Sequence, residues 1–177
     1  TFPVYVDNEC NYHKHLDSEW DVEFFVEKEI ENANENTTIV LKPSLKDLIE
    51  NNVFKYVRNN KNYIIPLWHT DLYFEEDNEI IEVKIEPKLP SNYWIDNENN
   101  IHQKIEFTLC ELWNFVEENK HIEIFFGSKK LILYPNSLTL SKEQIWRWEN
   151  KGITLINTKN ILDISKKKDA ILHIHII

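Results

Sequence analysis

The sequence predicts a mainly β protein made of two tandem small β-sandwich-like domains, each with one short helix. Short runs of β-branched and aromatic residues recur along the chain, and turn-forming segments rich in Asn and Asp separate them. A short phrase also occurs twice, as PSLKDLIENN at 43–52 and as FTLCELWNFV at 107–116. Each copy places a hydroxyl residue, a leucine, a variable residue, an acid, a leucine and a large apolar residue in the same order.

The bulk composition excludes several classes of protein. The 177 residues contain 30 acidic and 20 basic side chains, a net charge of −10, which argues against a duplex nucleic-acid binder and against docking on an anionic membrane. No apolar run approaches the roughly 18–20 residues that span a bilayer. Cys10 and Cys110 stand in unrelated contexts, so a reducing, cytoplasmic location is expected. The chain opens on Thr1 rather than on Met, which indicates a trimmed piece of a longer protein.

Residues 1–36 form an N-terminal extension in this prediction, with one loosely alternating strand at 21–30. The first domain covers 37–90 and opens with the strand TTIVLK, which Pro43 ends. Ser44 and Asp47 have the spacing of a capping box, so a short helix should begin there.

Strands then follow in the first domain at VFKYVR, on both sides of Pro66, and in the alternating segment IIEVKI. Pro66 favours an edge or a bulge over a central strand.

The second domain covers 91–177 and repeats this order. A short strand, a tight turn and a second strand occupy 92–107, and Thr108 with Glu111 forms another capping box before a short amphipathic helix. A hairpin, a Trp-containing strand and a closing strand, AILHIHII, complete it. The matching order of elements indicates a tandem duplication of a β-rich unit of roughly 70–85 residues.

This layout resembles the C-terminal substrate-binding region of DnaJ-type (J-domain) co-chaperones, which has two similar β-rich domains in tandem. The family's first-domain phrase is similar to residues 39–57, and its second-domain phrase to 99–116. The segment 168–176, KDAILHIHI, looks like the family's last strand. The Asn- and Ile-rich composition is similar to divergent DnaJ-like proteins of giant DNA viruses.

The resemblance implies a non-enzymatic module that binds unfolded or extended apolar polypeptide by strand addition in the first domain. It implies a groove formed by Ile39, Leu41, Tyr56 and Val57, although alternating apolar residues of this kind can equally face a core. Arg58 falls where an apolar groove residue is expected. The J-domain signature His-Pro-Asp does not occur in the sequence, so an Hsp70-type partner is expected only if a J domain lies upstream.

An alternative is a structural role, in which the same scaffold is an assembly component of a large DNA virus particle and contacts other virion proteins. The location would then be the host cytoplasm or the virion. Trp146 and Trp148 share one strand face around Arg147. They are candidates for an exposed protein-contact surface, with packing in the core as the other reading.

Two His-x-His pairs, His13/His15 and His173/His175, place two imidazoles on one face of a strand. Zinc needs further ligands, and the sequence offers no obvious set, so no metal and no cofactor are expected. No nucleophile elbow, phosphate loop or metalloprotease signature occurs, and no enzymatic activity is expected.

Overall fold

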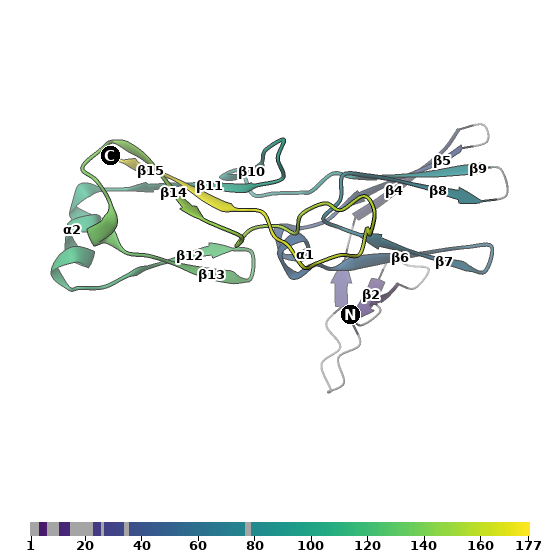
Figure 1. Ribbon diagram of the computed structural model, residues 1–177, viewed down its shortest axis with the longest axis horizontal. Helices are drawn as coiled ribbons and strands as arrows, with labels where there is room; N and C mark the ends of the chain where they lie inside the picture. Colours follow the sequence, from purple (N-terminus) through teal and green to yellow (C-terminus); the bar gives the residue numbers. More distant parts are fainter. Residues whose placement is uncertain (1–3, 7–10, 15–22, 26, 34–35, 77–78) are drawn as a thin grey trace. The chain divides into compact units, whose positions relative to one another are not determined.

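The computed structural model describes residues 4–6, 11–14, 23–25, 27–33, 36–76 and 79–177, with side chains from residue 37 onward. The chain forms two compact units (Figure 1). Unit 1 comprises Thr1–Lys88 and Ile156–Asp163, and unit 2 comprises Leu89–Leu155 and Ile164–Ile177. The mainly β class is confirmed, and each unit carries one α-helix in the part of the chain that the structure describes.

Unit 1 has a four-stranded sheet in the order β4-β5-β9-β8, in which the central pair β5 and β9 is parallel. A separate hairpin, β6–β7, follows the helix α1. A three-stranded sheet of β1 to β3 precedes them. The bounds of these elements are β1 Val4–Val6, β2 Asn11–Lys14, β3 Glu23–Phe25, β4 Glu27–Ala33, β5 Asn36–Lys42, α1 Leu45–Glu50, β6 Val53–Arg58, β7 Lys61–Pro66, β8 Asp71–Glu76 and β9 Glu79–Ile85.

Unit 2 has a four-stranded sheet in the order β10-β11-β15-β14, and its central pair β11 and β15 is also parallel. The hairpin β12–β13 follows the helix α2. The bounds are β10 Tyr93–Ile95, β11 Ile101–Phe107, α2 Leu109–Glu117, β12 Ile122–Phe126, β13 Lys129–Leu133, a 3-10 turn η1 at Pro135–Ser137, β14 Glu143–Trp148 and β15 Ala170–Ile176.

The two units share one topology. From β4 in unit 1 and from β10 in unit 2, the chain forms an antiparallel strand pair, a helix, a hairpin and then two strands, of which the last joins the sheet beside the second strand of the pair. The duplication expected from the repeated phrase is therefore present in the strand order. Unit 2 can be used as an internal reference for unit 1.

Both predicted capping boxes are present. The Ser44 hydroxyl accepts from the Asp47 amide at 3.3 Å, and the Asp47 carboxylate accepts from the Ser44 amide at 2.8 Å. Thr108 and Glu111 repeat this exchange at 3.2 and 2.7 Å. These bonds satisfy amide groups that a first helical turn leaves without partners.

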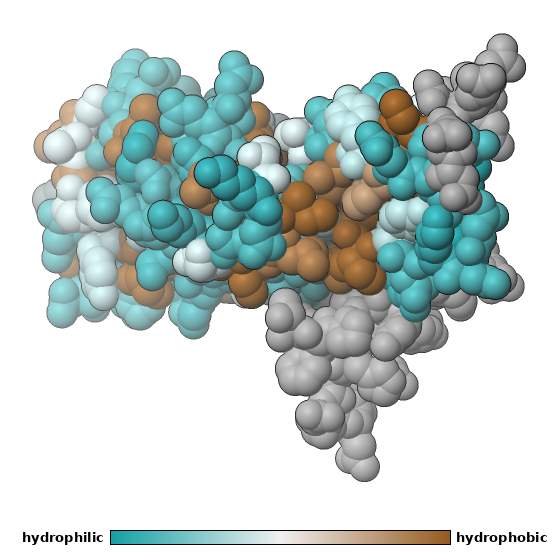
Figure 2. All heavy atoms as spheres, turned by 45° about the vertical axis from the view of Figure 1, so that its right-hand side comes forward, coloured by the Kyte–Doolittle hydropathy of each residue, from teal (hydrophilic) through white to brown (hydrophobic). Residues whose placement is uncertain are grey.

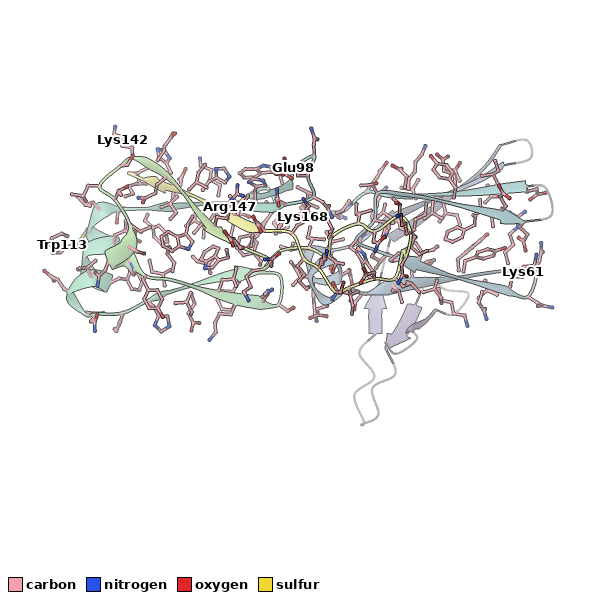
Figure 3. The ribbon with its side chains drawn as sticks, in the orientation of Figure 1. Lys61, Glu98, Trp113, Lys142, Arg147 and Lys168 are labelled. Atoms are coloured by element: carbon pink, nitrogen blue, oxygen red, sulfur yellow. The ribbon has the colours of Figure 1, made fainter. Side chains whose placement is uncertain are left out.

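The helices differ in what they bury. Leu45 and Ile49 of α1 are 6% and 5% exposed, whereas the equivalent Leu109 and Trp113 of α2 are 50% and 55% exposed. Trp113 points away from the rest of unit 2, and its indole N–H donates to Glu117 at 2.8 Å (Figure 3).

The turns depend on asparagine. Among the described residues, every non-glycine residue with positive φ is an Asn, and these are Asn51, Asn59, Asn60, Asn99, Asn119 and Asn150. Asn tolerates the left-handed region better than other residues with a side chain. The chain has only two glycines, so asparagine takes the positions where glycine is usual.

Two predicted boundaries need correction. Residues 1–36 are more than an extension, because β4 pairs along its whole length with β5 and belongs to the sheet of unit 1. Residues 156–163, predicted to lie in the second domain, belong to unit 1. Among the described residues, no helix is long and apolar enough to cross a membrane.

Candidate polypeptide-binding surface

The interior of unit 1 changes in character along its strands. At one end, Phe54, Ile65 and Leu72 are buried between the hairpin and the sheet. Two residues further along each strand come Tyr56, Tyr63 and Phe74, and after them Arg58, Lys61 and Glu76. The sandwich therefore passes from an apolar core, through an aromatic layer, to a charged tip.

The aromatic layer is packed against the core yet partly exposed. The Tyr56 and Tyr63 rings lie 6.1 Å apart, and Tyr63 meets Phe74 edge-to-face at 5.3 Å. The space-filling view shows that hydrophobic residues reach the surface in an area near the centre of this face (Figure 2). Partly exposed aromatic rings offer a large contact area at a low cost in side-chain entropy.

Ion pairs close the charged tip. The Glu76 side chain is 2% exposed, and its carboxylate lies 3.6 Å from the Arg58 guanidinium and 3.4 Å from the Lys61 ammonium. Arg58 also pairs with Glu79 and donates to the Thr37 hydroxyl at 3.0 Å. Lys61 lies at the end of the hairpin (Figure 3). Arg58 therefore joins the hairpin to the sheet through Glu76, Glu79 and Thr37. An apolar residue at this position could not make these bonds.

The predicted groove is wrong as a single surface. Ile39 and Leu41 are 0% exposed and belong to the core, and their strand β5 has a partner on each side. Tyr56 lies in the aromatic layer, whereas Val57 is on the opposite face of β6 and 48% exposed. Successive residues of a strand point to opposite faces, so Tyr56 and Val57 cannot line one groove.

A different strand offers a free edge. In the part of the chain that the structure describes, β8 is the last strand of its sheet and pairs only with β9. Its Phe74 side chain belongs to the aromatic layer, and its Tyr73 side chain is 65% exposed on the other face. An extended polypeptide that added to this edge would lie next to Phe74.

Unit 1 already holds a segment of chain that lies outside its own continuous sequence. Residues 156–163 lie between β14 and β15 in the sequence, and Ile161 packs against the core of unit 1. The Nε2–H of His69 donates to the Ile161 carbonyl at 3.0 Å. His69 is buried, which lowers its pKa, and its bond to the Ile161 carbonyl acts in the opposite direction.

The contact between His69 and Ile161 was not predicted from the sequence. The sequence feature that could have indicated it is the length of the connection between β14 and β15, which is far longer than the two residues between β8 and β9. A long connection in a compact domain is usually functional or unstructured.

Trp146 and Trp148, predicted as a protein-contact surface or as core, are both partly buried. Their rings lie 6.4 Å apart, and Trp148 meets Phe126 edge-to-face at 6.2 Å. The Trp148 indole N–H donates to the Ile132 carbonyl at 3.2 Å. The Trp148 contacts join β14 to the hairpin β12–β13. Arg147 points to the other face, where it pairs with Asp169 at 3.2 Å (Figure 3).

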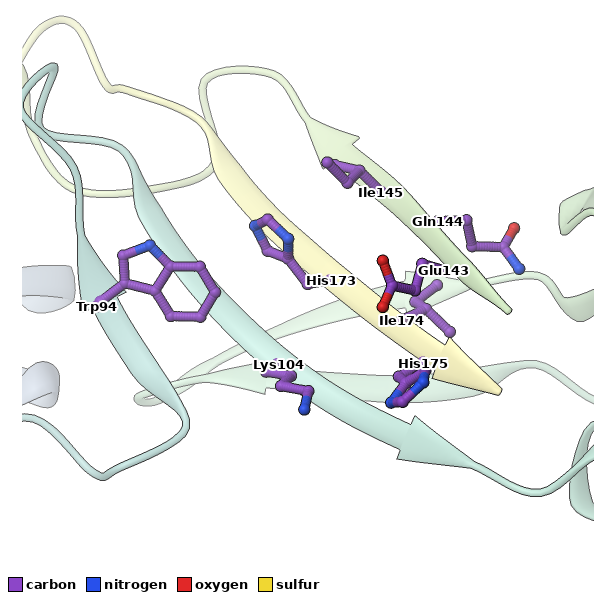
Figure 4. Close-up of a pocket in the computed structure, with 8 residues that line it drawn as sticks. All are labelled: Trp94, Lys104, Glu143, Gln144, Ile145, His173, Ile174 and His175. Carbon is purple, nitrogen blue, oxygen red and sulfur yellow. The ribbon is translucent and has the colours of Figure 1, made fainter. Parts of the chain in front are cut away.

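The outer face of the sheet in unit 2 carries an open pocket of about 430 Å³. Trp94 and Ile145 flank it on the strands at either side, with His173 of β15 between them (Figure 4). Its lining residues are Trp94, Lys104, Glu143, Gln144, Ile145, His173, Ile174 and His175.

A chain of hydrogen bonds lies beside this pocket. The Nε2–H of His102 donates to Asp96 at 3.0 Å, and His102 Nδ1 lies 2.9 Å from His173 Nε2. The Trp94 ring stacks on His102 at 5.0 Å and contacts His173 at 4.8 Å. Burial would raise the pKa of Asp96, but hydrogen bonds from His102, Asn100 and the Glu98 amide lower it to about 2.

The histidines supply no metal site within the part of the chain that the structure describes, where no group of three or more His, Cys, Asp or Glu side chains could hold an ion. His102 and His173 bond to each other, and His175 lies 3.5 Å from Glu106. Burial and the nearby His102 lower the pKa of His173. The side chains of His13 and His15 lie outside the described residues.

No protein-family model matches the sequence, and no curated protein matches it either.

Proposed function

We propose that the chain is a non-enzymatic polypeptide-binding module, in which unit 1 holds an extended apolar segment at the aromatic layer beside β8. The observation that supports this is that Ile161, in the segment 156–163, packs against the core of unit 1 and accepts a hydrogen bond from His69 through its main-chain carbonyl. A main-chain hydrogen bond is available to any sequence, and an aliphatic contact selects only for apolar character. Such a site tolerates many sequences.

Two features of unit 1 add to the proposal. Tyr56, Tyr63 and Phe74 pack against the same apolar core as Ile161, and the outer edge of β8 gives main-chain donors and acceptors. The sequence resemblance to the DnaJ C-terminal region, which also has two β-rich domains in tandem, implies binding of unfolded polypeptide.

The test uses two neighbouring residues of β6 that point to opposite faces. The purified chain should suppress aggregation of a chemically denatured enzyme, measured by light scattering. Tyr56→Asp should abolish this effect, because it places a charge in the aromatic layer. Val57→Asp is the matched control and should leave the effect intact. Equal behaviour of the two variants, both still folded by circular dichroism, would reject the site.

A second candidate function is a fixed role in an assembly such as a virus particle. The observation that favours it is the exposure of Leu109 and Trp113, at positions that are buried in the equivalent helix α1. Tryptophan is enriched at the centres of protein interfaces. In this case the chain should co-purify with one partner in fixed stoichiometry, and Trp113→Asp should release that partner.

A further inference from the structure

Unit 2 has an insertion between its last two strands that unit 1 lacks. The last two strands of unit 1 are joined by two residues, 77–78, whereas those of unit 2 are joined by residues 149–169. The two units share one topology, so the fold of a unit does not require the long connection. The middle of that connection, 156–163, belongs to unit 1.

Ile161 anchors the segment on unit 1, and several hydrogen bonds lie within the segment itself. Thr158, Lys159, Asn160 and Leu162 are exposed, and Ile161 supplies both the apolar contact and the carbonyl bound by His69. The Asn157 side chain donates to Asp163 at 2.9 Å and accepts from the amides of Lys159 and Asn160 at 3.0 and 3.3 Å. These three bonds join residues of the segment to one another and do not involve the rest of unit 1.

We propose that residues 156–163 are a tethered, displaceable occupant of the polypeptide site of unit 1, and that an outside polypeptide must compete with them. The occupant also defines the ligand class, a short segment with an aliphatic side chain whose own carbonyl accepts from His69 Nε2. This inference rests on the proposed function, since it concerns the same unit and adds its regulation. A tether of this length keeps the segment at an effective concentration in the millimolar range, so a weak intrinsic affinity is sufficient for occupancy.

The experiment measures the binding of a fluorescein-labelled synthetic peptide with the sequence of residues 154–165 to the full chain. Ile161→Ser removes the apolar anchor and should raise the affinity for the peptide about tenfold, because the site is then vacant. Leu162→Ser is the matched control, because Leu162 is 41% exposed, and should bind as the unchanged chain does. Adding His69→Ala to Ile161→Ser should reverse most of the gain, because the peptide loses the same hydrogen bond.

Two results would overturn the inference. One is equal affinity of the unchanged chain and both serine variants, and the other is weaker binding by Ile161→Ser. If Ile161→Ser does not fold, hydrogen exchange of the unchanged chain decides the question. Excess peptide should accelerate exchange at residues 156–163, and unchanged exchange would reject displacement.

The outcomes also separate this inference from the proposed function. Suppression of aggregation that is the same in the unchanged chain and in Ile161→Ser would leave polypeptide binding standing and reject the occupant. Tight peptide binding by Ile161→Ser, with no suppression of aggregation by any variant, would leave the occupied site standing and reject binding of unfolded clients.

Discussion

Replacing Arg58 tests whether the charged tip holds the two layers of unit 1 together. Glu76 is buried, and its carboxylate depends on Arg58 at 3.6 Å and on Lys61 at 3.4 Å. Arg58→Met removes one partner and leaves a carboxylate that water hardly reaches. Leaving a buried charge with an incomplete set of partners is strongly destabilising.

The loss of stability in Arg58→Met depends on how well Lys61 alone still pairs with Glu76. Breaking a fully buried pair costs about 3–5 kcal/mol. The Lys61 side chain is 54% exposed and still faces Glu76, so we expect a loss of about 2–3 kcal/mol in the unfolding free energy of unit 1. For a domain of this size, that loss corresponds to a fall in melting temperature of about 10–20 °C.

The assay is thermal unfolding combined with hydrogen exchange and mass spectrometry. Peptides from β6 to β9 report on unit 1, whereas peptides from β11 to β14 and from β15 report on unit 2 and serve as the internal control. Lys61→Met is the matched variant, and as an exposed partner it should cost about 0–1 kcal/mol. The double variant Arg58→Met with Glu76→Met should recover most of the stability, because no buried charge remains.

This stabilising role of Arg58 is refuted if Arg58→Met lowers the unfolding free energy no more than Lys61→Met does. It is also refuted if the double variant is less stable than Arg58→Met, since the loss would then come from packing and not from an uncompensated carboxylate.

Three further predictions concern pH and packing. The pKa of Asp96 is lowered to about 2, so its ionised form stabilises unit 2 above about pH 4 by at most about 2 kcal/mol. This stabilisation is lost as the pH falls from 4 to 2, and Asp96→Asn should remove that part of the acid unfolding curve. The pKa of His69 is lowered in the folded protein, so the unfolded chain binds a proton at this residue at a higher pH than the folded chain does. Unit 1 should therefore lose stability as the pH falls below about 6.5, and the melting temperatures at pH 7.5 and 5.5 should converge in His69→Gln. A Cβ at Gly152 would lie 2.3 Å from the Asp169 carbonyl oxygen, so Gly152→Ala should lower the stability of unit 2 by about 1–3 kcal/mol in urea unfolding, and an unchanged midpoint would contradict the close approach.

The parts of the fold that could be predicted are those with a local signal. The spacing of Ser44 to Asp47 and of Thr108 to Glu111 marks both helix starts, because the bonds they form span three residues. The repeated phrase indicated the duplication. Alternation identified β9 and β14, although period two shows that one face is buried without showing which one.

The predictions that failed concern residues whose surroundings depend on pairing between strands far apart in the sequence. Ile39 and Leu41 became core because β5 is joined on its second side by β9, which lies roughly 40 residues further along the chain. Nothing near β5 in the sequence indicates that this parallel partner exists. His102 and His173 meet only through the same kind of parallel register, 71 residues apart.

The asparagine residues in the turns affect the chemical stability of the protein over time. Asparagine is among the residues most prone to chemical damage by heat, and here it occupies the corners where the main chain reverses. A sample kept warm should acquire additional negative charge at its corners while its core is still intact. Glycine at those corners would suit the backbone geometry equally well and would remove the side chain that reacts.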